Sequence, residues 1–146
     1  DHEQAVEMVS LLETHTESAD MRKLGARISI SQKDEIGMMI GWLEKRGQAV
    51  PGSDEHADHD DHALMPGMLT PEEMRTLAAA RGRAFDRLFL TGMIKHHGGA
   101  LTMVADLFAT PGAAQDADMF SYASDIDADQ RMEIARMAAM LEEMKP

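Results

Sequence analysis

The sequence has no cysteine and few aromatic residues, with one Trp, one Tyr and four Phe among its 146 residues. Without cysteine, disulfides, thiolate metal sites and cysteine nucleophiles are excluded. Because aromatic side chains are so few, the core is expected to consist of Leu, Ile, Val, Ala and Met. Every apolar run falls short of the ~18 residues that a membrane-spanning helix needs, so we expect no membrane insertion.

Basic residues are also scarce, since 14 Lys and Arg stand against 26 Asp and Glu and give a formal net charge of −12. Nucleic-acid binding depends on Lys and Arg that neutralise phosphates, and anionic membranes attract the same residues. The charge therefore disfavours both partners and is compatible with the binding of cations. The sequence also offers no serine nucleophile elbow and no glycine-rich phosphate loop, so hydrolase chemistry is not supported.

Methionine, in contrast, is abundant, with 14 copies. Met favours helices and fills irregular gaps in hydrophobic cores. Its thioether is also a soft metal ligand that prefers Cu(I). Composition alone leaves both interpretations open.

An internal repeat divides the chain into two similar halves. Residues 2–8, HEQAVEM, resemble residues 97–103, HGGALTM, and residues 32–39, QKDEIGMM, resemble residues 130–137, QRMEIARM. The spacing between the paired segments differs by three residues, which a turn can absorb, and Ser18 lies where a helix N-cap is expected. Each half is therefore predicted to be a helix, a turn and a second helix.

The apolar residues of both halves recur in alternating steps of three and four, the period of helices that pack side by side in a left-handed bundle. We therefore predict an all-α, single-domain four-helix bundle over residues 1–146. Its parts, in chain order, are a first helical hairpin, an acidic loop rich in His and Met, a short helix followed by a break, and a second helical hairpin, at residues 1–47, 48–69, 70–82 and 83–146.

The short helix has a clear start signal in Thr70-Pro71-Glu72-Glu73. Thr70 is expected to cap the helix, Pro71 to occupy its first position, and Glu73 to complete a capping box. We expect this helix to run to about Arg81, where Gly82 follows and breaks it.

Polar residues interrupt the apolar stripes at positions that the repeat relates in pairs. They are His2, His97, Gln32, Gln130, Glu35 and Glu133, and Asp86 lies further along the stripe of His97. Burying such groups costs roughly several kcal/mol unless they are paired. They are therefore expected to form either a satisfied hydrogen-bond network that fixes helix register or a metal or proton site.

One face of the predicted third long helix carries both imidazole and thioether groups. Within roughly 120° of arc it presents Met93, His96, His97 and Met103, and the first repeat supplies the counterparts His2 and Met8. Such a donor set suits copper, because Met favours Cu(I) and His accepts either oxidation state. The alternative is a Met stripe that belongs to the core.

The acidic loop supplies a second group of metal candidates. His56, His59 and His62 recur every three residues among aspartates, and Met65 and Met68 follow in a Met-x-x-Met pair. The histidines and aspartates can hold Cu(II), Zn(II) or Ni(II), and the Met pair can add Cu(I). The same composition is equally typical of a solvated acidic loop that binds divalent ions only weakly.

Taken together, these motifs resemble the family called domain of unknown function 305. The stretch MIKHHGGALTM at 93–103 carries the resemblance, with Gln130 and Glu133 downstream and Met65-Pro66-Gly67-Met68 ahead of the Thr-Pro-Glu-Glu helix. The resemblance implies a ferritin-like four-helix fold, export from the cytoplasm and, for some relatives, copper or silver handling through Met and His. One departure is Asp1, which stands where the first repeat would carry the other His of the pair.

We therefore expect an extracytoplasmic metal-binding protein, a mature or trimmed product that acts on copper in sequestration, delivery or resistance. It is expected to be a monomer or homodimer and not an enzyme. The alternative is a non-catalytic structural or interaction module with a buried polar network and no specific metal. A di-iron or di-manganese oxidase is disfavoured, because such centres use Glu-x-x-His pairs and no His in the sequence has Glu three residues before it.

Overall fold

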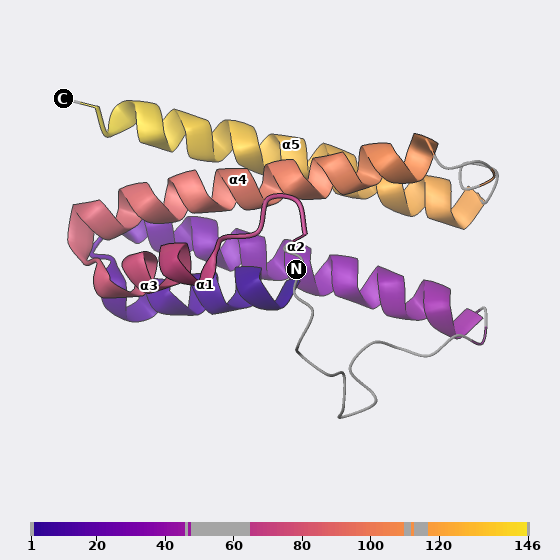
Figure 1. The fold of residues 1–146 in the computed structure, drawn as a ribbon, viewed down its shortest axis with the longest axis horizontal. Coiled ribbons are helices and arrows are strands. Elements are labelled where there is room, and N and C mark those ends of the chain that lie inside the picture. Colours follow the sequence, from indigo (N-terminus) through magenta and orange to yellow (C-terminus); the bar gives the residue numbers. More distant parts are fainter. Residues whose placement is uncertain (1, 46, 48–64, 110–111, 113–116, 146) are drawn as a thin grey trace.

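The two halves of the sequence form two helical hairpins in the computed structural model (Figure 1). The structure describes residues 2–45, 47, 65–109, 112 and 117–145, and within these ranges it contains helices and no strand. The helices are α1 (His2–His15), α2 (Ala19–Lys45), α3 (Pro71–Ala79), α4 (Gly82–Ala109) and α5 (Ala117–Glu143). The predicted all-α helical bundle is therefore confirmed. None of the described helices combines the length and the apolarity that crossing a membrane requires.

Local capping signals set where two of the helices begin. The Ser18 hydroxyl accepts a hydrogen bond from the backbone N–H of Met21 at 3.3 Å, and α2 begins at Ala19, directly after Ser18. Thr70 accepts from the N–H of Glu73, whose carboxylate accepts from the N–H of Thr70, so the predicted capping box is confirmed. Each cap satisfies backbone donors that the first turn of a helix leaves open.

The short helix ends two residues before its predicted end. Ala80 is extended, with φ −80° and ψ 154°, so α3 stops at Ala79. Gly82 has a φ of +61°, in the left-handed region that favours glycine. The predicted break therefore lies between α3 and α4, and α4 itself begins at Gly82.

The core joins the inner faces of both hairpins. As expected, most of its side chains are aliphatic or Met, among them Met8, Leu24, Ile28, Met93 and Met137. The expectation of a core without aromatic residues is wrong, however, because Phe85 and Phe89 are fully buried with ring centroids 6.0 Å apart. They lie one helical turn apart on α4 and are therefore neighbours on one face of that helix.

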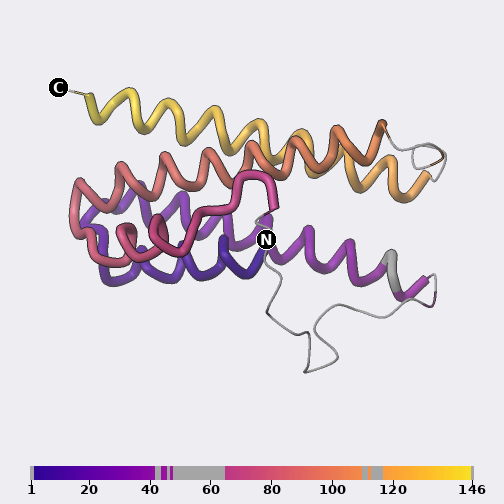
Figure 2. Tube along the Cα trace, viewed as in Figure 1, coloured from indigo at the N-terminus to yellow at the C-terminus, as the bar shows by residue number. Residues whose placement is uncertain are grey.

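The segment before α3 lies tightly against α4 (Figure 2). Gly67 has a φ of +81°, and its backbone approaches Gly99 so closely that a Cβ on Gly99 would overlap the Pro66 carbonyl. From α1, the Gln4 side chain donates to the Leu69 carbonyl at 3.0 Å and accepts from the Leu69 N–H at 2.9 Å. This turn therefore depends on glycine on one side and on an amide clamp on the other.

The hairpins differ in length. α1 has 14 residues and α2 has 27, so α1 covers about half of α2 at 1.5 Å per residue. Figure 1 shows α2, α4 and α5 continuing beyond the first turn of α1. His2 lies in that first turn, at the place where the candidate site is found.

Candidate functional site

A layer of buried polar side chains crosses the middle of the bundle. Glu35 of α2 is buried, and its carboxylate accepts hydrogen bonds from His2 Nε2 of α1 at 3.1 Å and from Gln130 Nε2 of α5 at 2.9 Å. Three helices therefore share one carboxylate. Burial of a charge is costly without partners, and these two donors offset that cost.

A second carboxylate forms the corresponding cluster of the other repeat. Glu133 of α5 accepts a hydrogen bond from Ser31 Oγ of α2 at 2.7 Å and another from His97 Nε2 of α4. His97 has no exposed surface. Both His–Glu pairs follow the arrangement that the repeat implies. Since Gln130 donates to Glu35, the repeat would lead one to expect Gln32 to donate to Glu133. Its neighbour Ser31 makes this hydrogen bond instead.

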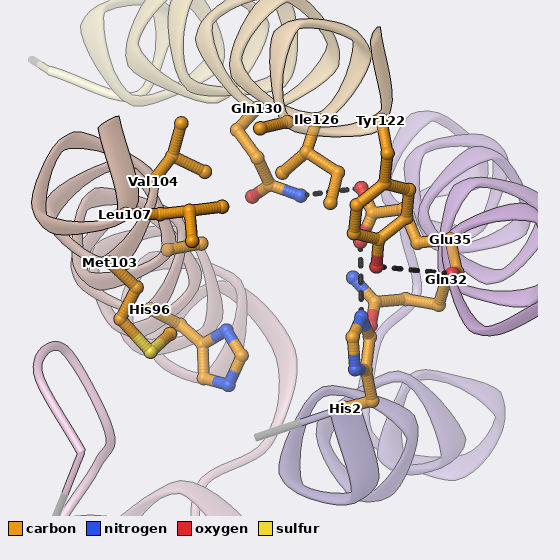
Figure 3. Close-up of a pocket in the computed structure, with 12 residues that line it drawn as sticks. His2, Gln32, Glu35, His96, Met103, Val104, Leu107, Tyr122, Ile126 and Gln130 are labelled. Atoms are coloured by element: carbon orange, nitrogen blue, oxygen red, sulfur yellow. Dashed lines mark hydrogen bonds and ion pairs between the residues drawn. The ribbon is translucent and has the colours of Figure 1, made fainter. Parts of the chain in front are cut away.

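Beside the first of these clusters lies a cavity of about 170 Å³. Figure 3 shows its lining, to which α1, α2, α4 and α5 all contribute. Its wall includes apolar side chains as well as the Glu35 cluster, and the lining residues are His2, Gln32, Glu35, His96, Ala100, Met103, Val104, Leu107, Tyr122, Ala123, Ile126 and Gln130. An apolar cavity with a few convergent polar groups is the usual form of a ligand or metal site.

Three side chains of this lining, His2, His96 and Met103, are of types that serve as borderline or soft metal ligands. In Figure 3 the Met103 thioether lies beside the His96 ring, and His2 faces them from the other side of the cavity. Side chains on a helix lean toward its N-terminus, which brings Met103 back toward His96, two turns earlier on α4.

Burial determines the charge of His96. This residue is 4% exposed, and desolvation lowers the pKa of its imidazole from 6.5 to about 4. The positive charge of a protonated His2 acts in the same direction. At neutral pH His96 is therefore uncharged, which is the form that coordinates metals.

Tyr122 closes the cavity on the α5 side. Burial, with a contribution from the Glu35 carboxylate, raises the pKa of Tyr122 to about 12. The phenol therefore stays protonated, and it donates to the backbone carbonyl of Glu35 at 3.3 Å. Sequence reasoning missed Tyr122, although the only tyrosine of the chain lies four residues before Ile126, which is on the inward stripe.

The structure separates the residues that the sequence placed on one face of α4. His96 and Met103 line the cavity, whereas Met93 is fully buried in the hydrophobic core. Met8, the first-repeat counterpart of Met103, is also fully buried there. The imidazole of His97 faces Glu133 instead of the cavity, and its Nδ1 is buried without a hydrogen-bond partner among the described residues.

Other predicted positions lie elsewhere. His56, His59 and His62 fall outside the described residues, while Met65 is exposed and Met68 half-buried in the turn against α4. Asp86 is buried, but it lines a different cavity and no hydrogen bond joins it to the Glu35 or Glu133 clusters. Gln32 lines the candidate cavity, and its buried Oε1 accepts no hydrogen bond from the described residues.

Among the described residues, His, Asp and Glu side chains alone do not form a metal site. No three His, Asp or Glu side chains there are grouped so that they could hold a metal ion. The donor set of the cavity is instead mixed, with two imidazoles and one thioether. Such a set fits copper better than it fits hard cations, which prefer oxygen.

The family model described as a domain of unknown function, DUF305, matches residues 1–141. The chain therefore belongs to the DUF305 family. No curated protein matches the sequence.

Solved structures of similar proteins share the fold. A DUF305 fragment from Deinococcus radiodurans is 27% identical, with a TM-score of 0.80, and the match covers 97% of this chain and 88% of that one. A DUF305 protein from Streptomyces coelicolor, described as secreted, is 29% identical with a TM-score of 0.76 over 98% and 86% of the two chains. CopM in its Cu(II)-bound form is 27% identical with a TM-score of 0.75 over 99% and 90%, and the Cu(I)-bound form of CopM is also similar.

Proposed function

We propose that this DUF305 chain is an extracytoplasmic copper-binding protein that holds the metal between His96, Met103 and His2. The observation that carries the proposal is the convergence of these three donors on one cavity, although they come from two helices and from both repeats. Membership of the family and the likeness to a protein solved with Cu(I) and with Cu(II) support copper as the metal.

The donor chemistry supports binding of both oxidation states. A thioether stabilises Cu(I), and neutral imidazole binds either state. Because burial keeps His96 uncharged at neutral pH, no proton has to leave this imidazole when the metal enters. The Glu35 carboxylate, hydrogen-bonded to His2, supplies a negative charge next to the bound cation and orients the His2 ring.

The surrounding residues are compatible with a holding role. Glu35 and Glu133 are engaged with His, Gln and Ser partners. We therefore propose capture and delivery or sequestration, with copper as cargo, and no turnover. Export from the cytoplasm is part of the same proposal, supported by the secreted description of the Streptomyces relative.

The test is a competition for Cu(I) between the metal-free protein and a chelator, repeated with the variant His2→Ala/His96→Ala/Met103→Leu. We expect the variant to lose at least about 100-fold in affinity, since the loss of even one outer-shell partner of a metal ligand typically costs roughly 10- to 100-fold. Met132→Leu is a matched control, because Met132 is exposed on α5 and is not part of the cavity lining. Equal affinities of wild type and triple variant would refute the site.

A second function has one observation in its favour, namely the hydrogen bonding within the two glutamate clusters. A structural or interaction module without a specific metal would need just such a network to fix helix register. It predicts that copper leaves the melting temperature unchanged, whereas tight binding to the native state raises it. Thermal unfolding with and without one equivalent of copper therefore separates the two functions.

A further inference from the structure

A second cavity, of about 410 Å³, lies at the end of the bundle where the α1–α2 turn, the start of α4 and the end of α5 meet. Three thioethers line it: Met21 from α2, Met140 from α5, and Met144, which follows the end of α5. Met21 is buried, and the other two are half-buried against the core. Met140 lies in the last turn of α5, and Met144 directly follows its end at Glu143.

Asp86 of α4 lines the same cavity, and one of its carboxylate oxygens has no hydrogen-bond partner among the described residues. Its side chain is 7% exposed, and its buried Oδ1 accepts no hydrogen bond from any residue that the structure describes. A buried carboxylate normally has hydrogen-bond donors or a counter-ion, because desolvation of the charge is costly. A cation in the cavity would compensate this charge.

The rim adds further negative charge. Glu17, Asp20 and Glu143 line the cavity and are exposed, and the one cationic side chain of the lining is Arg83. The Arg83 guanidinium donates to the backbone carbonyl of Met144, which holds it at the end of α5. With four carboxylates against one guanidinium, the cavity attracts cations and repels anions.

We infer that this cavity is a second metal site, one for a soft monovalent cation such as Cu(I) or Ag(I). Thioethers are neutral, soft donors that suit these ions. Because neutral donors leave the ion's charge uncompensated, the buried Asp86 carboxylate supplies the counter-charge. Hard divalent ions require several oxygen ligands, whereas three of the four carboxylates here are exposed at the rim and the three methionines are buried or half-buried.

The test uses Ag(I), which does not change oxidation state, and methionine methyl groups labelled with carbon-13. In chloride-free buffer, the methyl signals of Met21, Met140 and Met144 should shift and saturate within the first few equivalents of Ag(I). Asp86→Asn should weaken binding at these methyls on the order of tenfold, as expected for the loss of one partly screened charge. Glu143→Gln, the matched change at the rim, should weaken it less than threefold, because exposed charges are strongly screened.

The two metal sites are separable in the same experiment. In the variant His2→Ala/His96→Ala/Met103→Leu, the shifts of the Met140 and Met144 methyls should persist, whatever happens to copper binding at the first cavity. In Met140→Leu/Met144→Leu, which nearly conserves side-chain volume, the remaining Met21 shift should disappear while Met103 still responds. The inference is overturned if excess Ag(I) leaves the Met140 and Met144 methyls unmoved, or if Asp86→Asn binds Ag(I) there as tightly as wild type.

Discussion

Two pairs of residues at equivalent positions of the two halves, His2 with His97 and Met8 with Met103, are placed in opposite ways. In the first, His2 faces the cavity with a side chain 29% exposed, and Met8 is buried in the core. In the second, His97 is buried completely and Met103 faces the cavity. Of these two pairs, one His and one Met line the cavity and the other two residues are buried in the interior, while His96 supplies the second imidazole. The repeat in the sequence predicts that paired residues occupy equivalent helix positions. The packing of neighbouring helices decides whether each residue faces the cavity or the core.

The comparison extends to the turn before α3. Gln4 and Gly99 occupy equivalent positions of the repeat, and both contact the segment 66–69. Gln4 binds the backbone of Leu69 with its amide, whereas Gly99 admits the Pro66 carbonyl by having no side chain. The same segment is therefore held between the two repeats by different means.

The largest difference between the repeats is expected in stability. His97→Ala should lower the free energy of unfolding by about 3–5 kcal/mol, because it removes a partner from a buried carboxylate. His2→Ala should cost less, about 1 kcal/mol, because the His2 side chain is 29% exposed and water can take its place beside Glu35. Urea unfolding of metal-free protein measures the free energy of unfolding of both variants. Equal losses would contradict the expected difference between the buried His97 and the partly exposed His2.

The pH dependence of stability should single out His96. Its folded pKa of about 4 lies below the ordinary value of 6.5. The unfolded chain therefore binds a proton in this window that the folded chain does not, so the stability present above pH 6.5 is lost as the pH falls toward 4. The loss should total about 3 kcal/mol.

This expectation is checked by unfolding metal-free wild type and His96→Leu in urea at several pH values between 4 and 7. The difference between the two proteins isolates His96 from the other histidines. If both curves fall in parallel, His96 does not titrate as its burial implies.

Substitutions at Gly98 and Gly99 of α4 test the close contact between α4 and the turn at Pro66 and Gly67. Gly99→Ala should destabilise the protein by about 1–3 kcal/mol, because a Cβ there would overlap the Pro66 carbonyl and the turn must move. Gly98→Ala is the control, since a Cβ at Gly98 would meet nothing within 4 Å. It should stabilise the helix by up to about 1 kcal/mol. Thermal and urea unfolding of the two variants should therefore shift in opposite directions.

The smallest effect expected is that of exchanging sulfur for carbon at the two equivalent methionines. Met103→Leu should weaken Cu(I) binding about tenfold, or 1.4 kcal/mol, with little change in stability. Met8→Leu should leave Cu(I) affinity unchanged and cost less than about 1.5 kcal/mol of stability. Chelator competition on both variants tests whether the repeats have divided their roles, and a loss of affinity in Met8→Leu would contradict that division.

Much of the fold could be predicted because it rests on local signals. The three-and-four periodicity predicted helices, and Ser18 and the Thr70–Glu73 capping box act within one turn of a helix start. The helices and both caps are found in the structure. The end of α3 and the burial of Phe85 and Phe89 were missed, because they depend on how α3 and α4 meet other elements.

The site was harder to predict for the same reason. Helical spacing placed Met93, His96, His97 and Met103 on one face, but a face of roughly 120° reaches both the core and the cavity. Which residues line the cavity depends on neighbouring helices, as does the replacement of Gln32 by Ser31 as the partner of Glu133. Tyr122 gave only a weak signal, as a lone tyrosine near an inward stripe.

The most direct test of the copper site is anomalous scattering at the copper edge from crystals of the protein soaked with one equivalent of copper. A peak in the cavity bounded by His2, His96 and Met103, within about 2.0–2.4 Å of nitrogen and sulfur donors, is the predicted result. Copper density confined to the acidic loop, or absent from the protein, would contradict the account.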